Sequence, residues 1–170
     1  MTYQTALDLL AKRGVAVEQV AEIVHRLQSP YNADLTMEEC VESVMAVLGK
    51  REVQYTLFTG IALDMLAEQK LLPDPLQSIM ENDEALYGAD ETLALGIVHV
   101  YGMIGLTSFG YLDKEKTGII RALNNNRSHI HVFLDDLVAG LAAAASARIA
   151  HQNKNARTYA AKRSEENSAS

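Results

Sequence analysis

The chain has 170 residues, of which 48% are hydrophobic and 22% charged, and its formal net charge is −7. This length suits one domain with a full core, while the acidity disfavours nonspecific nucleic-acid binding and adsorption to anionic membranes. The single cysteine, Cys40, excludes a disulfide within the chain and favours a cytoplasmic protein.

Helix-period patterns dominate the sequence, and we find no strand-like alternation flanked by turn signals. Thr36 is expected to form a capping box with Glu39, and Pro73 and Pro75 to interrupt the chain. The expected helical segments are residues 3–13, 17–28, 40–49, 51–69, 75–83, 89–105, 114–124 and 131–151. We therefore predict an all-α, single-domain orthogonal helical bundle of about six to eight helices with a central apolar helix. Residues 1–151 form this domain, and residues 152–170 form a polar, partly disordered tail.

The first two expected helices, around Gly14, also suit a DNA-binding helix-turn-helix. A recognition helix offers basic or amide side chains to bases and phosphates, whereas this second helix carries Glu18 and Glu22. We therefore favour a packed helical hairpin and expect no nucleic-acid partner. A DNA-binding regulator is kept as a hypothesis behind the two functions considered below.

Residues 92–112 form an apolar run of about the length that crosses a bilayer. The run also contains His99, two tyrosines, three hydroxyl side chains and four glycines. We interpret it as the central helix of a soluble protein and expect no transmembrane span. His99 is then expected to be a hydrogen-bonded core histidine. The N-terminus has early charges and no cleavable apolar run, so it does not resemble a signal peptide.

Two acidic pairs, Asp90–Glu91 and Asp135–Asp136, each precede a run of small and apolar residues. Adjacent helical residues differ by about 100° in direction, and small residues one turn later let two helices approach closely. Two such helices crossing near their acidic ends would place four carboxylates in one pocket. Because repulsion opposes the ionisation of all four, Mg²⁺ or Mn²⁺ is expected between them.

A simpler interpretation is that each pair caps its own helix, since acids in a first turn gain about 0.3–1 kcal/mol each. This interpretation suits Asp135 and Asp136 less well, because Phe133 and Leu134 already look helical.

Three further polar residues receive structural interpretations. His131 and the neighbouring His129 could extend a metal site, but a surface or capping role is favoured. Asp64 is interpreted as a solvated helix position rather than a ligand.

The segments YGADETLALGIVHVYG, GYLDKEKTGIIRALN and HVFLDDLVAGLAAAA resemble the phosphatidylglycerophosphatase A family, especially its soluble, all-helical branch from Gram-positive bacteria. These segments cover roughly residues 87–151. REVQYTLFTGIALDMLAE and DPLQSIMENDEALYG are also similar to that branch, so the resemblance spans most of the chain.

The resemblance implies a magnesium-dependent lipid phosphatase that converts phosphatidylglycerophosphate to phosphatidylglycerol and phosphate. It assigns the metal, Mg²⁺ or Mn²⁺, to Asp90, Glu91, Asp135 and Asp136. It also implies that Asp113 orients water or a metal ligand and that Lys116 holds phosphate oxygens. Arg127 stands where membrane-bound members have a histidine and could itself bind phosphate, while Gly110 stands where they have an arginine.

A rival hypothesis is a non-catalytic helical oligomer or regulatory protein whose acidic metal site is a relic. The Gly and Ala faces of residues 137–147 suit a subunit interface, so a homo-oligomer is expected. The other expected partner is a phosphate-bearing substrate, a phospholipid headgroup if the resemblance extends to the substrate. The expected location is the cytoplasm or the membrane periphery.

Overall fold

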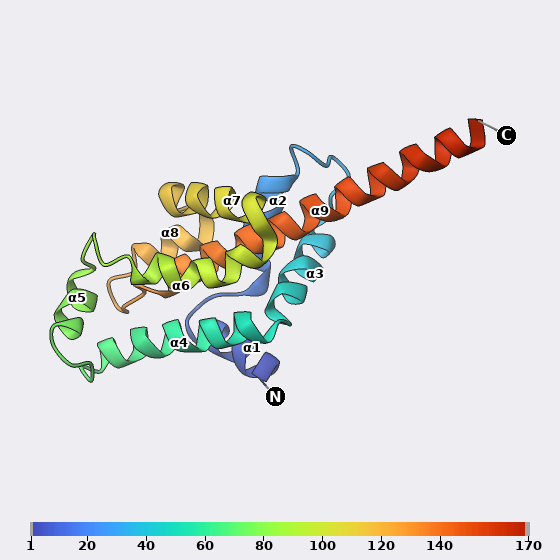
Figure 1. Ribbon diagram of the computed structural model, residues 1–170. Coiled ribbons are helices and arrows are strands. Elements are labelled where there is room, and N and C mark those ends of the chain that lie inside the picture. Colours follow the sequence, from blue (N-terminus) through green and yellow to red (C-terminus); the bar gives the residue numbers. More distant parts are fainter. Residues whose placement is uncertain (1, 169–170) are drawn as a thin grey trace.

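The computed structural model describes residues 2–168, with side chains described as far as Asn153. Every regular element in this part of the chain is a helix, which confirms the all-α prediction (Figure 1). The helices are α1 (Thr2–Lys12), α2 (Val17–Gln28), α3 (Met37–Leu48), α4 (Arg51–Glu68), α5 (Leu76–Asn82), α6 (Ala89–Val98), the 3₁₀ helix η1 (His99–Tyr101), α7 (Gly102–Glu115), α8 (Gly118–Asn124) and α9 (Leu134–Ser168).

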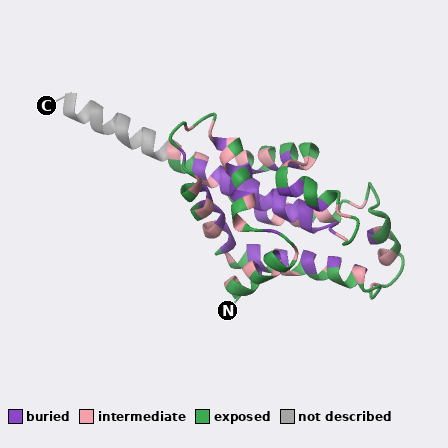
Figure 2. Cartoon of the chain, turned by 180° about the vertical axis from the view of Figure 1, so that it is seen from behind, coloured by how far each residue is buried: buried purple, intermediate pink, exposed green. Residues whose placement is uncertain are grey.

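The start of α9 is the centre of the bundle. Every residue from 131 to 147 is buried, and Figure 2 shows this segment as the continuous buried core of the molecule. The helices that pack on it are α2, α3, α4, α6, α7 and α8. Because its Gly and Ala residues are buried within the chain, the predicted subunit interface over residues 137–147 is wrong.

Missing methyl groups let two helices lie close to α9. A Cβ atom on Gly140 would come within 3.2 Å of the backbone oxygen of Ala94 in α6. A Cβ atom on Gly60 of α4 would come within 2.5 Å of Leu137 and 3.0 Å of Phe133. The expected close approach of the helices that follow the two acidic pairs is therefore present.

The apolar run of residues 89–115 folds as two helices rather than one. α6 ends at Val98, η1 follows, and Gly102 has a φ of 70°, a value that favours glycine. α7 then turns back (Figure 1). By length and composition alone the run could cross a membrane. Only 28% of its most apolar window is buried inside the protein, whereas the core helix of a soluble protein would be mostly buried. The prediction of one central helix here is wrong, as is that of a core histidine, since His99 is exposed.

The N-terminal helices differ from the predicted hairpin. α1 packs against α4, whereas α2 packs against α3, α8 and α9, so the apolar faces of α1 and α2 have different partners. The predicted capping box is confirmed: the Glu39 N–H donates to Thr36 Oγ1 at 3.2 Å, and the Thr36 N–H donates to Glu39 Oε2 at 2.9 Å.

The last helix is longer than expected from the apolar pattern, because α9 continues to Ser168. The expected fraying falls on residues whose side chains lie outside the described part, so the partly disordered tail stays a prediction.

Candidate functional site

A polar cavity of about 290 Å³ lies at the acidic end of α9. It is enclosed by the loop between α5 and α6, the starts of α6 and α9, the end of α7 and the end of α8. The lining residues are Asp83, Glu84, Ala85, Gly88, Asp90, Glu91, Asp113, Lys116, Asn124, Val132, Asp135 and Asp136. The chain thus brings both predicted acidic pairs, together with Asp113 and Lys116, to one place.

Lys116 binds three carboxylates at once. Its Nζ donates to Asp135 Oδ2 at 2.9 Å and to Asp136 Oδ1 at 3.0 Å, and it lies 2.8 Å from Asp113 Oδ1. Asp135 and Asp136 are buried, and an unpaired buried carboxylate is strongly unfavourable. The ammonium group therefore offsets part of the cost of burying these two acids.

The backbone of Lys116 is unusual for a lysine. It ends α7 with φ 45° and ψ 63°, in the left-handed region where helices normally place glycine or asparagine. Such a conformation costs a residue with a Cβ atom about 1–2 kcal/mol. The three ion pairs of the side chain give a physical reason for a lysine at this strained position.

Asp90 and Glu91 occupy the first turn of α6, which begins after Gly88 at a φ of 63°. The Glu91 N–H donates to Asp90 Oδ1 at 3.0 Å. Glu91 Oε2 is buried and has no hydrogen-bond partner among the described residues. One oxygen each from Asp90, Glu91 and Asp136 lies within 4.8 Å of the other two. Three carboxylates from two helices thus converge on a common point.

Asp135 and Asp136 also lie in a first turn, because α9 begins at Leu134. The expectation that they fall inside the helix is therefore wrong, and the positive end of the helix dipole stabilises both acidic pairs. Asp135 and Asp136 can thus cap the start of α9 and line the cavity at the same time.

The cavity raises the pKa of its acids. Burial, and then the side chain of Glu91, raise the pKa of Asp90 to about 7, although the backbone N–H of Glu91 opposes this shift. Burial, and then the charge of Asp135, raise the pKa of Asp136 to about 8, although Lys116 opposes this shift. Burial would lower the pKa of Lys116, but Asp135 and Asp113 outweigh it and hold the pKa above its ordinary value. The cavity therefore favours positive charge, supplied by protons or by a cation.

The donor set fits a hard divalent cation. Seven carboxylates (Asp83, Glu84, Asp90, Glu91, Asp113, Asp135 and Asp136) line the cavity with one ammonium, which leaves a formal charge of −7 + 1 = −6. The donors are oxygens, and one of them, Glu91 Oε2, has no other partner in the described part of the chain. Mg²⁺ and Mn²⁺ prefer such ligands.

Arg127 and the two histidines are not brought to this cavity. Arg127 is exposed and is absent from the described residues that line it. His129 Nδ1 lies 3.3 Å from Glu68 Oε1, away from the acidic pairs. His131 is buried rather than on the surface as predicted, and its Nδ1 lies 3.1 Å from Arg13 Nη2.

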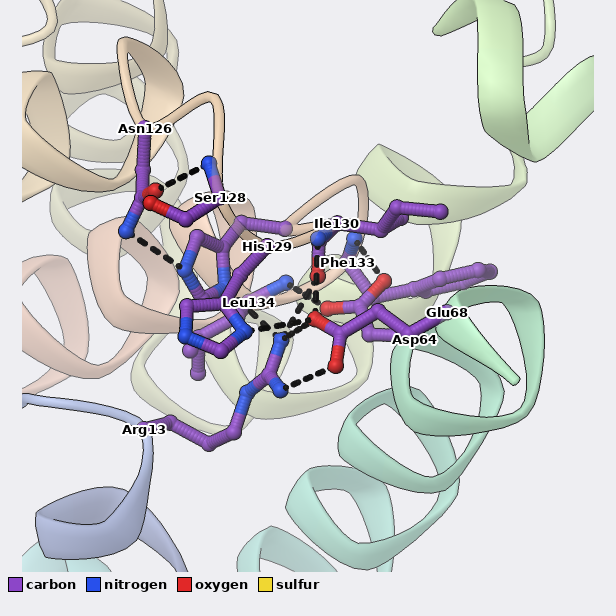
Figure 3. Close-up of polar contacts among 10 residues, drawn as sticks. Arg13, Asp64, Glu68, Asn126, Ser128, His129, Ile130, Phe133 and Leu134 are labelled. Carbon is purple, nitrogen blue, oxygen red and sulfur yellow. Dashed lines mark hydrogen bonds and ion pairs between the residues drawn. The ribbon is translucent and has the colours of Figure 1, made fainter.

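Asp64 is the principal residue that sequence reasoning missed. It is 0% exposed, so its assignment as a solvated position is wrong. Its two carboxylate oxygens each accept a backbone N–H, from Phe133 and from Leu134, immediately before the Asp135–Asp136 pair (Figure 3). The available signal was the spacing of Gly60, Asp64 and Glu68, which places all three on one face of a helix.

Comparisons with known proteins agree with this architecture. The family model described as Phosphatidylglycerophosphatase A matches residues 14–151. Uncharacterized protein YpjQ of Bacillus subtilis is 58% identical over 148 residues, which cover 87% of this chain and 84% of YpjQ.

Two crystal structures share the fold. The structure of YpjQ has a TM-score of 0.87 at 56% identity, covering 91% of this chain and 96% of that one. The low temperature requirement C protein from Listeria monocytogenes has a TM-score of 0.87 at 47% identity, covering 90% and 97%. With the family match over most of its length and its acidic residues gathered in one cavity, the chain belongs to the phosphatidylglycerophosphatase A family.

Proposed function

We propose that this protein is a Mg²⁺- or Mn²⁺-dependent phosphatase that hydrolyses a phosphomonoester. The observation that carries the proposal is the convergence of Asp90, Glu91 and Asp136 within 4.8 Å of one another, beside the ammonium of Lys116. Family membership supports the same reaction class, and phosphatidylglycerophosphate is the substrate that the family name suggests.

In this proposal Asp90, Glu91 and Asp136 hold the cation, with Asp135 beside them. When bound, the cation would polarise the phosphoryl group and stabilise the negative charge that develops on it. In the net reaction water adds to phosphorus, the ester P–O bond breaks, and the alcohol leaves with a proton.

Lys116 and Asp113 act on the substrate side of the cavity. The Lys116 side chain is 25% exposed, so its ammonium can donate to a phosphate oxygen while it still binds Asp135. Asp113 is 34% exposed and is bonded to Lys116, which positions its carboxylate to accept a hydrogen bond from attacking water. Arg127 lies outside the cavity, and its predicted contact with phosphate remains a proposal of smaller effect.

The rim of the cavity supports a lipid ester as the substrate. Leu86 is 99% exposed, and its neighbours Glu84, Ala85 and Gly88 line the cavity. A leucine held fully in water gains about 1.5–3 kcal/mol when it enters an apolar phase. Leu86 would enter the lipid surface while the headgroup phosphate reaches the acids, which supports a location at the membrane periphery.

The direct experiment is phosphate release by the full chain from vesicles containing phosphatidylglycerophosphate and from soluble phosphomonoesters, with Mg²⁺, Mn²⁺ or chelator. We expect release that requires the cation and that falls by at least about a hundredfold in the Asp135→Asn/Asp136→Asn double variant, because the removed groups hold the reacting centre. Cation binding without release from any ester would contradict the proposal.

A second candidate function is that of a non-catalytic oligomer, and one surface favours it. Val100, Met103, Leu106 and Tyr111 are exposed on η1 and α7. Near them a cavity of about 600 Å³ is lined partly by Tyr31 and Tyr111. Sedimentation of the wild type and of Met103→Asp would show whether this face joins two copies, and an unchanged monomer would exclude it.

A further inference from the structure

We propose that Asp64 is a positioning residue for the acidic cavity: it fixes the first turn of α9 so that Asp135 and Asp136 face Lys116. The inference concerns the same site as the proposed function and depends on it only for the cation readout.

The anchor joins two distant parts of the chain. Asp64 Oδ1 accepts the Phe133 N–H at 3.0 Å, and Asp64 Oδ2 accepts the Leu134 N–H at 3.0 Å. The first N–H groups of a helix have no partner within the helix and require a cap. Here the cap comes from α4, 69 and 70 residues away along the chain, rather than from a local side chain.

The chemistry of this cap requires a carboxylate. Both oxygens of Asp64 accept hydrogen bonds, and an asparagine would turn one oxygen into a donor facing a backbone N–H. Asp64 has no hydrogen bond to a cationic side chain in the described structure. Burial raises the pKa of Asp64 to about 7, and the two backbone N–H groups of α9, and then the charge of Arg13, oppose this shift. The Phe133 and Leu134 N–H groups are therefore the direct partners that favour the carboxylate form of Asp64.

A second clamp holds the segment just before this cap. Glu68, one turn further along α4, accepts the Ile130 N–H at 2.9 Å, and Arg13 Nη2 donates to the Ile130 carbonyl oxygen at 2.7 Å. Arg13 and Glu68 are themselves joined by two hydrogen bonds, of 3.0 and 2.6 Å. Figure 3 shows these contacts converging on one short stretch of backbone.

The hydrogen bonds of Asp64 and the acidic cavity lie on opposite sides of the first turn of α9. Leu134, whose N–H is bound by Asp64, directly precedes Asp135, whose carboxylate binds Lys116. Gly60 of α4 packs against Phe133 and Leu137 on either side of the same turn, leaving no room for a Cβ atom. Any rotation that moved the two aspartates away from Lys116 would break the bonds to Asp64.

The test compares Asp64→Asn in α4 with a matched change in α3 that also removes a hydrogen bond to α9. Ser43 is buried and its hydroxyl donates to the Ala145 carbonyl oxygen of α9 at 2.9 Å, away from the cavity. Ser43→Ala thus also removes a buried hydrogen bond to α9. By calorimetric titration with Mn²⁺, we expect Asp64→Asn to weaken binding roughly 10–100-fold, as residues that orient metal ligands commonly do. Ser43→Ala should stay within about twofold of wild type, because its bond lies away from the ligands.

Hydrogen exchange gives a readout that needs no cation. The amides of Phe133 and Leu134 should exchange faster in Asp64→Asn and at the wild-type rate in Ser43→Ala. Should Asp64→Asn fail to fold, Glu68→Gln replaces it, since its amide oxygen can still accept the Ile130 N–H. We expect this variant to weaken Mn²⁺ binding in the same direction but less.

Two results would overturn the inference. The first is wild-type Mn²⁺ affinity in a folded Asp64→Asn protein that is only less stable, which would make Asp64 a structural cap. The second result concerns the case in which the wild type binds no Mn²⁺ and the proposed function fails, while the positioning role of Asp64 can still be tested. In that case the ¹⁵N signal of Lys116 Nζ must shift in Asp64→Asn and not in Ser43→Ala, and an unshifted signal excludes positioning.

Discussion

Lys116 Nζ and Asp136 Oδ1 lie 3.0 Å apart, joining the end of α7 to the start of α9 inside the acidic cavity. The contact shows how an apolar helix tolerates two adjacent aspartates. The ammonium of Lys116 is shared between Asp135 and Asp136. The cavity keeps a net negative charge, and the effects predicted below for Lys116 and Asp136 depend on it.

Replacing Lys116 with methionine should destabilise the folded chain in chelator. Removing one partner of a buried pair leaves the other charge uncompensated, and because Lys116 is partly exposed we expect a loss of about 2 kcal/mol. The loss should grow as the pH rises, since the aspartates can no longer take up protons. Urea unfolding in EDTA measures it. Arg127→Met is the control, because it removes a positive charge outside the cavity, and an equal loss there would contradict the account.

Asp136→Asn should change stability in a pH-dependent manner. The pKa of Asp136 is raised to about 8 in the folded state, against about 4 for an unfolded aspartate. Between these values the folded state binds more protons, so stability falls as the pH rises. In chelator, Asp136→Asn should therefore match wild type at pH 4 and be more stable at pH 8.

The same variant should show the opposite effect with Mg²⁺. The proposed cation would stabilise the folded wild type by binding it, and Asp136→Asn would remove one of the proposed ligands. Unfolding of the wild type and of Asp136→Asn at pH 8, in chelator and in Mg²⁺, measures both stability differences. If Asp136→Asn is equally destabilised in chelator and in Mg²⁺, the aspartate is an ordinary cap.

The clamp between α1, α4 and the segment before α9 predicts acid sensitivity. Burial, and then the charge of Arg13, lower the pKa of His131 to about 4, so the folded state keeps this ring neutral. The unfolded chain takes up a proton near pH 6.5, so stability is lost as the pH falls from about 6.5 to 4. His131→Leu should flatten this part of the unfolding curve. His99→Leu, at an exposed ring, should not, and equal curves for the two variants would contradict the assignment.

Leu86→Ser should separate lipid from soluble substrates. The side chain is 99% exposed at the cavity rim and has no packing role to lose, so folding should be unaffected. We expect phosphate release from vesicles to fall about tenfold, the equivalent of losing about 1.4 kcal/mol of transfer free energy. Release from a soluble phosphomonoester should be unchanged. A parallel loss on both substrates would show that Leu86 acts within the cavity.

Several features of the fold and of the site could be predicted because their signals are local. Thr36 and Glu39 form their capping box through neighbouring residues. The acidic pairs lie in first turns, and the small residues after them, Ala94 and Gly140, let α6 and α9 meet. Composition and spacing carry such information directly.

The remaining features depend on which surfaces meet, and that information is spread over the chain. Asp64 resembles any polar residue on a helix until its bonds to Phe133 and Leu134 are seen. The left-handed backbone of Lys116 places its ammonium among three aspartates, and no pattern of residue types predicts it. Gly102 divides an apolar run that periodicity alone reads as continuous.

The contact between Gly140 and Ala94 has a consequence for the choice of ion. The carboxylates stand on α6 and α9, so their spacing is set by how near the two backbones come, and a single added methyl group would widen it. Proteins distinguish small from large divalent cations by the size of the space and the number of oxygens around it. Selectivity for ionic radius in this chain would then be determined by the hydrophobic core, about one turn of helix away from the carboxylates.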